Sequence, residues 1–218
     1  MIAKLDRFFQ TYSYLIFLLS MAFWLGLSPI IGVVTSIHII DVLVLSVIDL
    51  SAFYFLYHER FRLLSFLLIF VSILSLWVSF IFPELRLAGE LERASHFVLF
   101  IFITIHLIRK IFKSKVVDES TIYASISGYM MIGIMSSILC WFLHNSVPES
   151  YNIPVSSRII DYSYYSYVTM STLGYGDVLP QTEAAKSLAV FITLIGQFYM
   201  TVLVALLIGK FLNQRNNA

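Results

Sequence analysis

The amino-acid sequence predicts an all-α membrane protein with six transmembrane helices. Hydrophobic residues make up 59% of the 218 residues, charged residues only 12%, and the mean hydropathy is +0.87. Soluble domains contain about 25% charged residues, so most side chains of this chain are expected to meet lipid. A transmembrane helix needs roughly 20 mostly apolar residues. Windows of this kind lie at about 12–34, 38–57, 62–82, 95–112, 121–143 and 184–209.

The first window has the flank of a cleaved leader, because Lys4 and Arg7 precede an apolar run. That run continues to about Val34, however, and no small-residue cleavage site follows a short apolar core. We therefore expect the first window to be retained as a transmembrane helix.

The positions of lysine and arginine predict that both termini are cytoplasmic. With six spans and a cytoplasmic N-terminus, ten of the 14 basic residues lie inside and four outside, which agrees with the positive-inside rule. The inner set is Lys4, Arg7, Arg60, Arg62, Arg109, Lys110, Lys113, Lys115, Lys210 and Arg215; the outer set is Arg86, Arg93, Arg158 and Lys186. We expect a multi-pass protein of the plasma (cell inner) membrane, with residues 144–183 outside.

The composition also excludes several function classes. The net charge of +1 gives no reason to expect a nucleic-acid partner. The single cysteine, Cys140, rules out an internal disulfide and a cysteine metal cluster. The five histidines match no zinc-binding spacing, and we find no nucleophile–base pair. We expect no enzymatic activity, no catalytic residue and no metal cofactor. The chain ends a few residues past the last window, so we also expect no soluble regulatory domain in it.

The long connection between the fifth and sixth windows predicts a helix that enters the membrane without crossing it. Residues 161–172, DYSYYSYVTMST, would form a helix of about 18 Å, which is too short for roughly 30 Å of hydrocarbon. Asp161 is a candidate N-cap. Such a helix, entering from outside, directs its negative C-terminal dipole end into the membrane, where it attracts cations.

The next residues, TLGYGD, must lead the chain back out. Irregular backbone at membrane depth persists only where protein buries it or where it lines water. Gly174 and Gly176 can adopt positive φ without a Cβ clash. Alternating handedness along this strand would turn successive carbonyls toward one axis. Four copies around that axis would form stacked rings of oxygen that replace the hydration shell of an ion.

The segment VTMSTLGYGDVLP, residues 168–180, resembles the signature of the tetrameric potassium channel superfamily, whose filter reads T-x-G-Y-G and commonly continues with Asp. The resemblance covers about residues 120–212 and is only topological before Lys115. It implies a pore domain at 116–218 in a four-fold symmetric homotetramer. Its parts would be an outer helix at 121–143, a pore helix at 161–172, a selectivity filter at 172–177 and an inner helix at 184–212.

The resemblance also implies the roles of individual residues. The ion-coordinating groups would be main-chain carbonyls, with the Thr172 hydroxyl at the innermost site and Asp177 in a carboxylate ring at the outer mouth. The filter residues are Thr172, Leu173, Gly174, Tyr175 and Gly176, of which the first four would hold K⁺. The pore-helix residues expected to support the filter are Tyr164, Tyr165, Val168 and Thr169.

Two of these supporting positions depart from the family pattern. The family often has a Trp–Trp pair where this chain has Tyr164 and Tyr165, which are smaller but can still donate hydrogen bonds. Some relatives have a glutamate at the position of Val168 that couples to the mouth aspartate. This chain cannot make that coupling.

The sixth window contains small residues with two open interpretations. Gly196 lies near its middle and is either a hinge, as such glycines are in this family, or a site of close helix packing. Ala205 and Gly209 lie nearer the cytoplasmic end, where they would line a gate or simply pack against a neighbouring helix.

The first four windows match a voltage sensor in number only. A sensor needs several basic residues inside the membrane field, yet the interior of the fourth window reads FVLFIFITI. Voltage sensors usually carry a basic residue at every third position. Every third residue after Arg93 is first His96 and then an apolar residue each time. We therefore expect no conventional voltage gating, and we assign residues 1–115 to a four-helix N-terminal domain.

Asp49 falls near the middle of the second window, where a charge is costly unless it is paired or neutralised. It is either a counter-charge or proton-sensitive group facing a histidine or arginine of the fourth helix, or a hydrogen-bonded acid without a sensing role.

The sequence thus predicts a potassium-selective channel with K⁺ as its permeant ligand and three identical subunits and membrane lipids as its partners. Two alternatives stay open: a potassium-coupled transporter and a non-conducting auxiliary membrane subunit.

Overall fold

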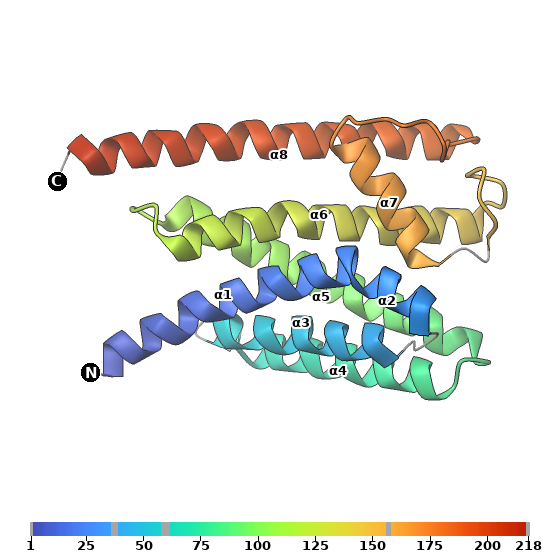
Figure 1. Cartoon of the computed structure of the whole chain (residues 1–218), viewed down its shortest axis with the longest axis horizontal. Helices are drawn as coiled ribbons and strands as arrows, with labels where there is room; N and C mark the ends of the chain where they lie inside the picture. Colours follow the sequence, from blue (N-terminus) through green and yellow to red (C-terminus); the bar gives the residue numbers. More distant parts are fainter. Residues whose placement is uncertain (1, 36–38, 58–61, 156–157, 217–218) are drawn as a thin grey trace. The chain divides into compact units, whose positions relative to one another are not determined.

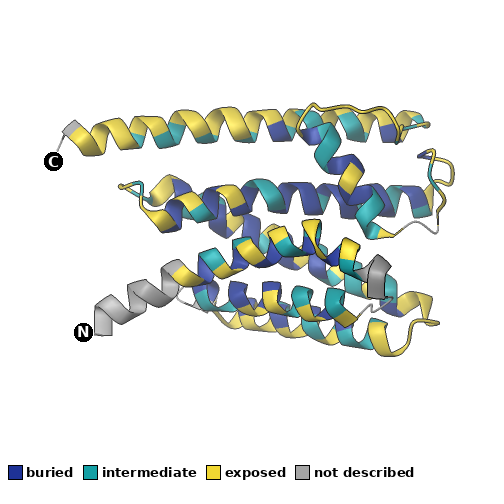
Figure 2. Cartoon of the chain, viewed as in Figure 1, coloured by how far each residue is buried: buried dark blue, intermediate teal, exposed yellow. Residues whose placement is uncertain are grey.

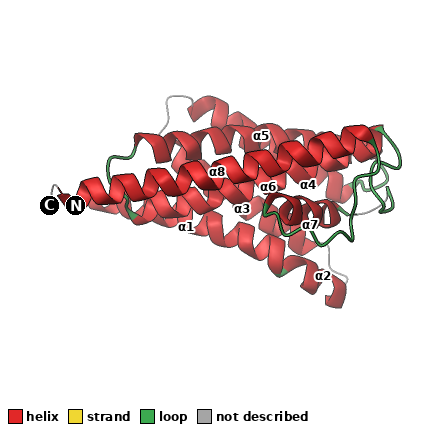
Figure 3. Cartoon of the chain, turned by 90° about the horizontal axis from the view of Figure 1, so that it is seen from above, coloured by secondary structure: helices red, strands yellow, loops and turns green. Residues whose placement is uncertain are grey.

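The computed structural model describes residues 2–35, 39–57, 62–155 and 158–216. Regular structure within these ranges is helical, and a single isolated antiparallel bridge joins Tyr151 and Pro180 (Figures 1 and 3). The helices are α1 (Ile2–Gly26), α2 (Ser28–Thr35), α3 (Ile39–Tyr57), α4 (Arg62–Ile81), α5 (Arg86–Lys113), α6 (Glu119–Ser146), α7 (Ile159–Met170) and α8 (Glu183–Asn216). Five of them, α3 to α6 and α8, are long and apolar enough to cross a membrane.

The first predicted window is divided between two helices. The helix α1 ends at Gly26 and α2 begins at Ser28, with a turn at Leu27. Pro29 has no backbone N–H, so it cannot continue the i to i−4 hydrogen-bond ladder at this point. The described apolar part of α1, Tyr12–Gly26, is shorter than the other candidate spans. Five spans are therefore supported by length and composition, and the sixth stays a prediction.

The chain divides into two compact units, Met1–Gly128 and Tyr129–Ala218, called unit 1 and unit 2 below. The division falls inside α6, which is one continuous helix and contributes residues to both units. The predicted domain boundary at residues 115/116 stays a prediction. Asp118 caps the start of α6 by accepting the backbone N–H of Thr121 at 2.9 Å. Partial burial of Asp118 opposes its ionisation, but hydrogen bonds from Thr121 and Ser120 prevail and lower its pKa.

The core of unit 1 lies where α3 meets α1 and α5. The ring of Tyr14 on α1 stacks on Phe55 of α3, with 4.6 Å between centroids. The Tyr14 hydroxyl lies 3.0 Å from Nε2 of His106 on α5. Figure 2 marks buried residues on all three helices. Because lipid is as apolar as these side chains, close packing and hydrogen bonds must supply most of the association energy.

The core of unit 2 forms between the second half of α6, the short helix α7 and the first half of α8. Its buried members are Ile132, Cys140, Trp141, Tyr151, Tyr162, Tyr165, Met170, Ala185 and Ile192. No described residue of α8 after Gly196 is buried, and Figure 2 shows this part as exposed and partly exposed residues. The second half of α8 thus offers a long apolar surface that the chain itself does not cover.

Candidate functional site

The short helix α7 spans Ile159–Met170 and runs between α6 and α8 (Figure 1). It begins and ends two residues earlier than predicted, and Arg158 rather than Asp161 is its N-cap. Asp161 occupies the third helical position, and its carboxylate accepts the backbone N–H of Arg158 at 3.0 Å. This is the back-reaching half of a capping box. Asp161 therefore still stabilises the N-terminus of the helix, but from inside it.

Close packing fixes α7 against α6. Tyr167 donates its hydroxyl hydrogen to the carbonyl of Met130 at 2.5 Å. A Cβ atom at Gly133 would overlap the Tyr167 ring, so glycine at this position lets the ring pack closely against α6. The sequence analysis missed both Tyr167 and Gly133, because the pairing depends on which faces of two separate helices meet.

Gly196 plays the same part on α8. A Cβ atom there would overlap Met170, the last residue of α7. Two side chains of α8 also lie near the α7 carbonyls, with Thr193 Oγ1 at 3.5 Å from Thr169 O and Gln197 Nε2 at 3.4 Å from Met170 O. The structure thus supplies a packing reason for Gly196. Ala205 and Gly209 are exposed in the single chain, so their gate role stays a prediction.

The backbone after α7 alternates between left-handed and ordinary conformations. Thr172, Gly174 and Gly176 have φ of +62°, +59° and +77°, whereas Leu173 and Tyr175 do not have positive φ. Positive φ is rare for a β-branched residue such as Thr172 and marks a constrained backbone. Because every second residue is left-handed, successive carbonyls of this segment can turn toward the same side.

The start of this segment is tied to α7 by the backbone. The amide groups of Leu173 and Gly174 both donate to the carbonyl of Val168, at 3.0 and 3.3 Å. No heavy atom lies within 4 Å of a Cβ built on Gly174 or Gly176. Within one chain, the need for glycine here is therefore conformational rather than a matter of space.

The outer end of the segment is held by Tyr164. Its hydroxyl donates to Oδ2 of Asp177 at 2.6 Å, and its ring stacks on Tyr175 with 6.5 Å between centroids. Hydrogen bonds from Tyr164 and from the backbone N–H of Val178 lower the pKa of Asp177 below its ordinary value. The Asp177 carboxylate is therefore ionised at neutral pH.

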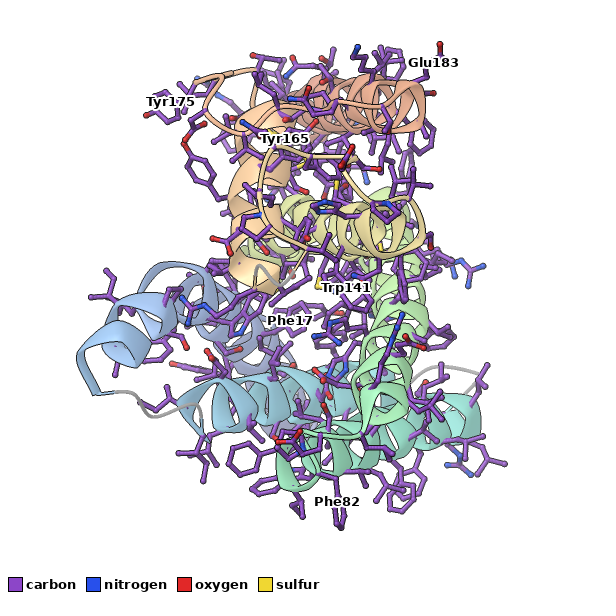
Figure 4. The ribbon with its side chains drawn as sticks, turned by 90° about the vertical axis from the view of Figure 1, so that its right-hand side faces the viewer. Phe17, Phe82, Trp141, Tyr165, Tyr175 and Glu183 are labelled. Carbon is purple, nitrogen blue, oxygen red and sulfur yellow. The ribbon has the colours of Figure 1, made fainter. Side chains whose placement is uncertain are left out.

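The neighbouring Tyr165 lies in the core of unit 2. Its side chain is buried in unit 2, where its ring meets Tyr151 edge-on with 5.0 Å between centroids. Figure 4 shows this difference: Tyr175 projects from the loop, and Tyr165 lies inside the unit. The structure brings Tyr164, Tyr175 and Asp177 together and places Tyr165 in the core.

We expect Tyr164→Phe to make potassium current more sensitive to external acid. Loss of the hydroxyl removes the main group that lowers the pKa of Asp177. Protonation of the mouth carboxylates, and the fall in current that it causes, should therefore occur at a higher external pH. The measurement is single-channel current in bilayers against external pH. Tyr162→Phe is the matched control, because its hydroxyl lies 2.9 Å from Nδ1 of His144 instead. An equal shift in both variants would contradict the assignment.

Asp49 is fully buried inside unit 1 and faces a histidine of α5. Its Oδ2 accepts the hydroxyl of Ser72 on α4 at 2.7 Å and lies 3.4 Å from Nε2 of His96. Nδ1 of His96 lies 2.9 Å from the Glu92 carbonyl. A carbonyl can only accept, so Nδ1 carries a hydrogen. Nε2 of His96 has no hydrogen-bond partner, although it faces the carboxylate. The other carboxylate oxygen, Oδ1, has no hydrogen-bond partner.

Among the residues that the structure describes, no group of three histidine, cysteine, aspartate or glutamate side chains could hold a metal ion.

The match to a protein-family model lies within unit 2. Residues 130–213, from α6 to near the end of α8, match the family model described as ion channel. Two-pore potassium channel 2 of Arabidopsis thaliana is 27% identical over 100 residues, which cover 46% of this chain and 22% of that protein. The voltage-gated potassium channel Kch of Escherichia coli is 27% identical over 128 residues, covering 58% and 28%.

A third relative, the hyperpolarization-activated voltage-gated potassium channel of Methanocaldococcus jannaschii, is 25% identical over 79 residues, covering 36% of this chain and 35% of the relative. The matched segments thus cover about a fifth to a third of the relatives' own lengths. No solved structure matches the chain significantly. Residues 130–213 thus resemble an ion channel domain, and these relatives are named as potassium channels.

Proposed function

We propose that this protein is a potassium-selective channel that conducts K⁺ passively. The observation that carries the proposal is the alternation of positive φ at Thr172, Gly174 and Gly176, directly after a short helix that lies between two candidate spans. A hairpin turn needs one or two such residues, whereas three at a spacing of two would let an extended segment turn its carbonyls toward one side.

The carbonyls of Thr172, Leu173, Gly174 and Tyr175 would replace the hydration shell of a passing K⁺. A single chain supplies only one wall of such a pathway, so the proposal requires four identical subunits around an axis. The apolar second half of α8, which its own chain leaves exposed, supports an assembly in which lipid and neighbouring subunits cover it.

Two electrostatic features would bring cations to the filter. The C-terminal end of α7, which precedes Thr172, carries the negative end of a helix dipole. Asp177 would contribute four carboxylates at the outer mouth, each kept ionised by Tyr164. Because both features are negative, they would concentrate cations and exclude anions before the carbonyls select among cations.

The composition of α5 supports gating by something other than a conventional voltage sensor. Its basic residues stand at the two ends, and the stretch from Phe97 to Ile108 contains no arginine or lysine. Moving a charge through the membrane field yields about 2.3 kcal/mol per 100 mV, so a helix without charge in its interior gains little from voltage.

Recording from the purified full chain in planar bilayers tests the proposal. We expect the reversal potential in mixed K⁺ and Na⁺ to lie near the potassium equilibrium value and barium to block the current. The mass in detergent should correspond to four chains of 25.0 kDa, or about 100 kDa of protein. Equal permeability to sodium would refute the selectivity, and a monomer would refute the assembly.

A further inference from the structure

The outer end of the filter has a second restraint, from the segment that precedes α7. Residues 150–152 run antiparallel to residues 179–181 and form the Tyr151–Pro180 bridge. The backbone N–H of Asn152 donates to the Leu179 carbonyl at 3.3 Å, and the N–H of Gln181 donates to the Ser150 carbonyl at 2.8 Å. The strand that leaves the filter is therefore paired with a short piece of chain about 27 residues earlier in the sequence.

The Asn152 side chain adds two hydrogen bonds to this pairing. Its Nδ2 donates to the main-chain carbonyl of Asp177 at 2.8 Å, and its Oδ1 accepts the backbone N–H of Leu179 at 2.6 Å. The side-chain amide thus donates to the Asp177 carbonyl and accepts from the Leu179 N–H, the backbone groups on either side of Val178. It pairs with this segment as a peptide group would. Asp177 therefore accepts two hydrogen bonds that restrain it. Its carboxylate accepts from the Tyr164 hydroxyl, and its main-chain carbonyl accepts from the Asn152 side chain.

Tyr151 anchors this restraint in the core of unit 2. Its side chain is only 2% exposed, and its ring meets those of His144, Tyr162 and Tyr165 edge-on. These rings belong to α6 and α7, the helices that carry the filter. A shift of Asn152 would therefore have to pull Tyr151 out of a packed aromatic cluster, so Asn152 is a firm point of attachment.

We infer that Asn152 is a positioning residue that holds the outer end of the filter in its conducting conformation; the inference rests on the proposed channel function. A strand with alternating φ makes no regular hydrogen bonds of its own, and Gly176, next to Asp177, has the largest positive φ of the strand. Restraint must therefore come from outside it. Tyr164 fixes a side chain that can rotate, whereas Asn152 fixes the main chain itself, and with it the carbonyls that face the ion.

The amide at position 152 can be tested by a change of one atom. In Asn152→Asp, the carboxylate can still accept from Leu179 but cannot donate to the Asp177 carbonyl. Protonation would restore a donor, because a carboxylic acid has one O–H and one free acceptor oxygen. External acid should therefore reverse the defect of Asn152→Asp if the lost hydrogen bond causes it. If Asn152 served only to fill space, acid would not have this effect.

The experiment compares the full-length wild type, Asn152→Asp and Asn152→Ala as single channels in bilayers. At neutral external pH we expect Asn152→Asp, which loses one hydrogen bond of ordinary strength, to shorten conducting bursts about tenfold. Asn152→Ala, which loses both side-chain hydrogen bonds, should shorten them at least as much. At an external pH of about 4, near the ordinary carboxyl pKa, bursts of Asn152→Asp should lengthen at least threefold relative to wild type at the same pH. Bursts of Asn152→Ala should not lengthen.

Asn145→Asp is the matched control, because Asn145 undergoes the same chemical change near the outer end but donates only to Trp141 of its own helix. It should keep wild-type bursts. The inference would be overturned if Asn152→Ala kept bursts of wild-type length. It would also be overturned if acid did not lengthen the bursts of Asn152→Asp, or if that variant did not open at either pH. A wild type that does not conduct K⁺ would instead overturn the proposed function, so the two failures are distinguishable.

Discussion

Gly174→Ala is expected to abolish potassium current through a channel that still assembles. Gly174 has a φ of +59°, where an L-residue with a Cβ costs roughly 1–2 kcal/mol. Four subunits carry the change together, so the conducting conformation loses ~4–8 kcal/mol relative to others. Because ~2.8 kcal/mol already corresponds to a hundredfold change, open-filter occupancy should fall by about a hundredfold or more. The measurement is macroscopic K⁺ current per reconstituted tetramer.

Gly26→Ala is the control for this prediction. A Cβ built on Gly26 also meets no heavy atom within 4 Å, but its φ is not in the positive range, so alanine is tolerated. Its current should match that of the wild type. If Gly174→Ala retained potassium-selective current of wild-type size, the left-handed geometry at this position would have no functional role.

Asp49→Leu is expected to lower the free energy of unfolding by about 3–5 kcal/mol, the cost of removing one partner of a buried ion pair. His96 would keep its place among apolar side chains with Nε2 facing no acceptor, and the Ser72 hydroxyl would lose its acceptor. The double variant Asp49→Leu/His96→Leu should recover most of the loss, because apolar pairs of similar size replace buried ion pairs at little cost. Denaturant titration in detergent measures both.

Asp41→Leu is the matched control on the same helix. Asp41 is only partly buried and accepts a hydrogen bond from Ser28, so its loss should cost about 1 kcal/mol. Additive losses in the Asp49 and His96 variants would show that the two side chains do not act as a pair.

A separate experiment tests whether Asp49 senses protons. Open probability is measured against pH for Asp49→Asn and for the wild type. Identical curves would show that Asp49 has no proton-sensing role.

The local features of the site could be read from the sequence because they depend on neighbouring residues. Apolar length predicted the five long helices, and polarity and length predicted a short helix between α6 and α8. The spacing of Gly174 and Gly176 predicted where the backbone would need positive φ, and both have it. Thr172 was assigned to the filter for its oxygen atoms, but its own positive φ could not be foreseen, since threonine has no local preference for it.

Other features depend on which distant residues meet, and only the tertiary structure decides that. Asn152 and Leu179 are 27 positions apart, and Asp49 and Ser72 are 23 apart. The pair Tyr164 and Tyr165 points in two directions because successive residues of a helix face about 100° apart. One therefore reaches Asp177, and the other enters the core. No periodicity in the sequence distinguishes a polar residue that restrains a filter from one that merely faces water.

Taken by itself, the sequence determined that this chain lives in a membrane and where its backbone can present a row of carbonyls, since hydrophobic length and glycine conformation are local properties. The tertiary structure decided what holds that row in place: Tyr164 and Asn152 on the strand, and Gly133 and Gly196 under the helix before it. Those contacts exist only because folding brings separate segments within hydrogen-bond and van der Waals distance.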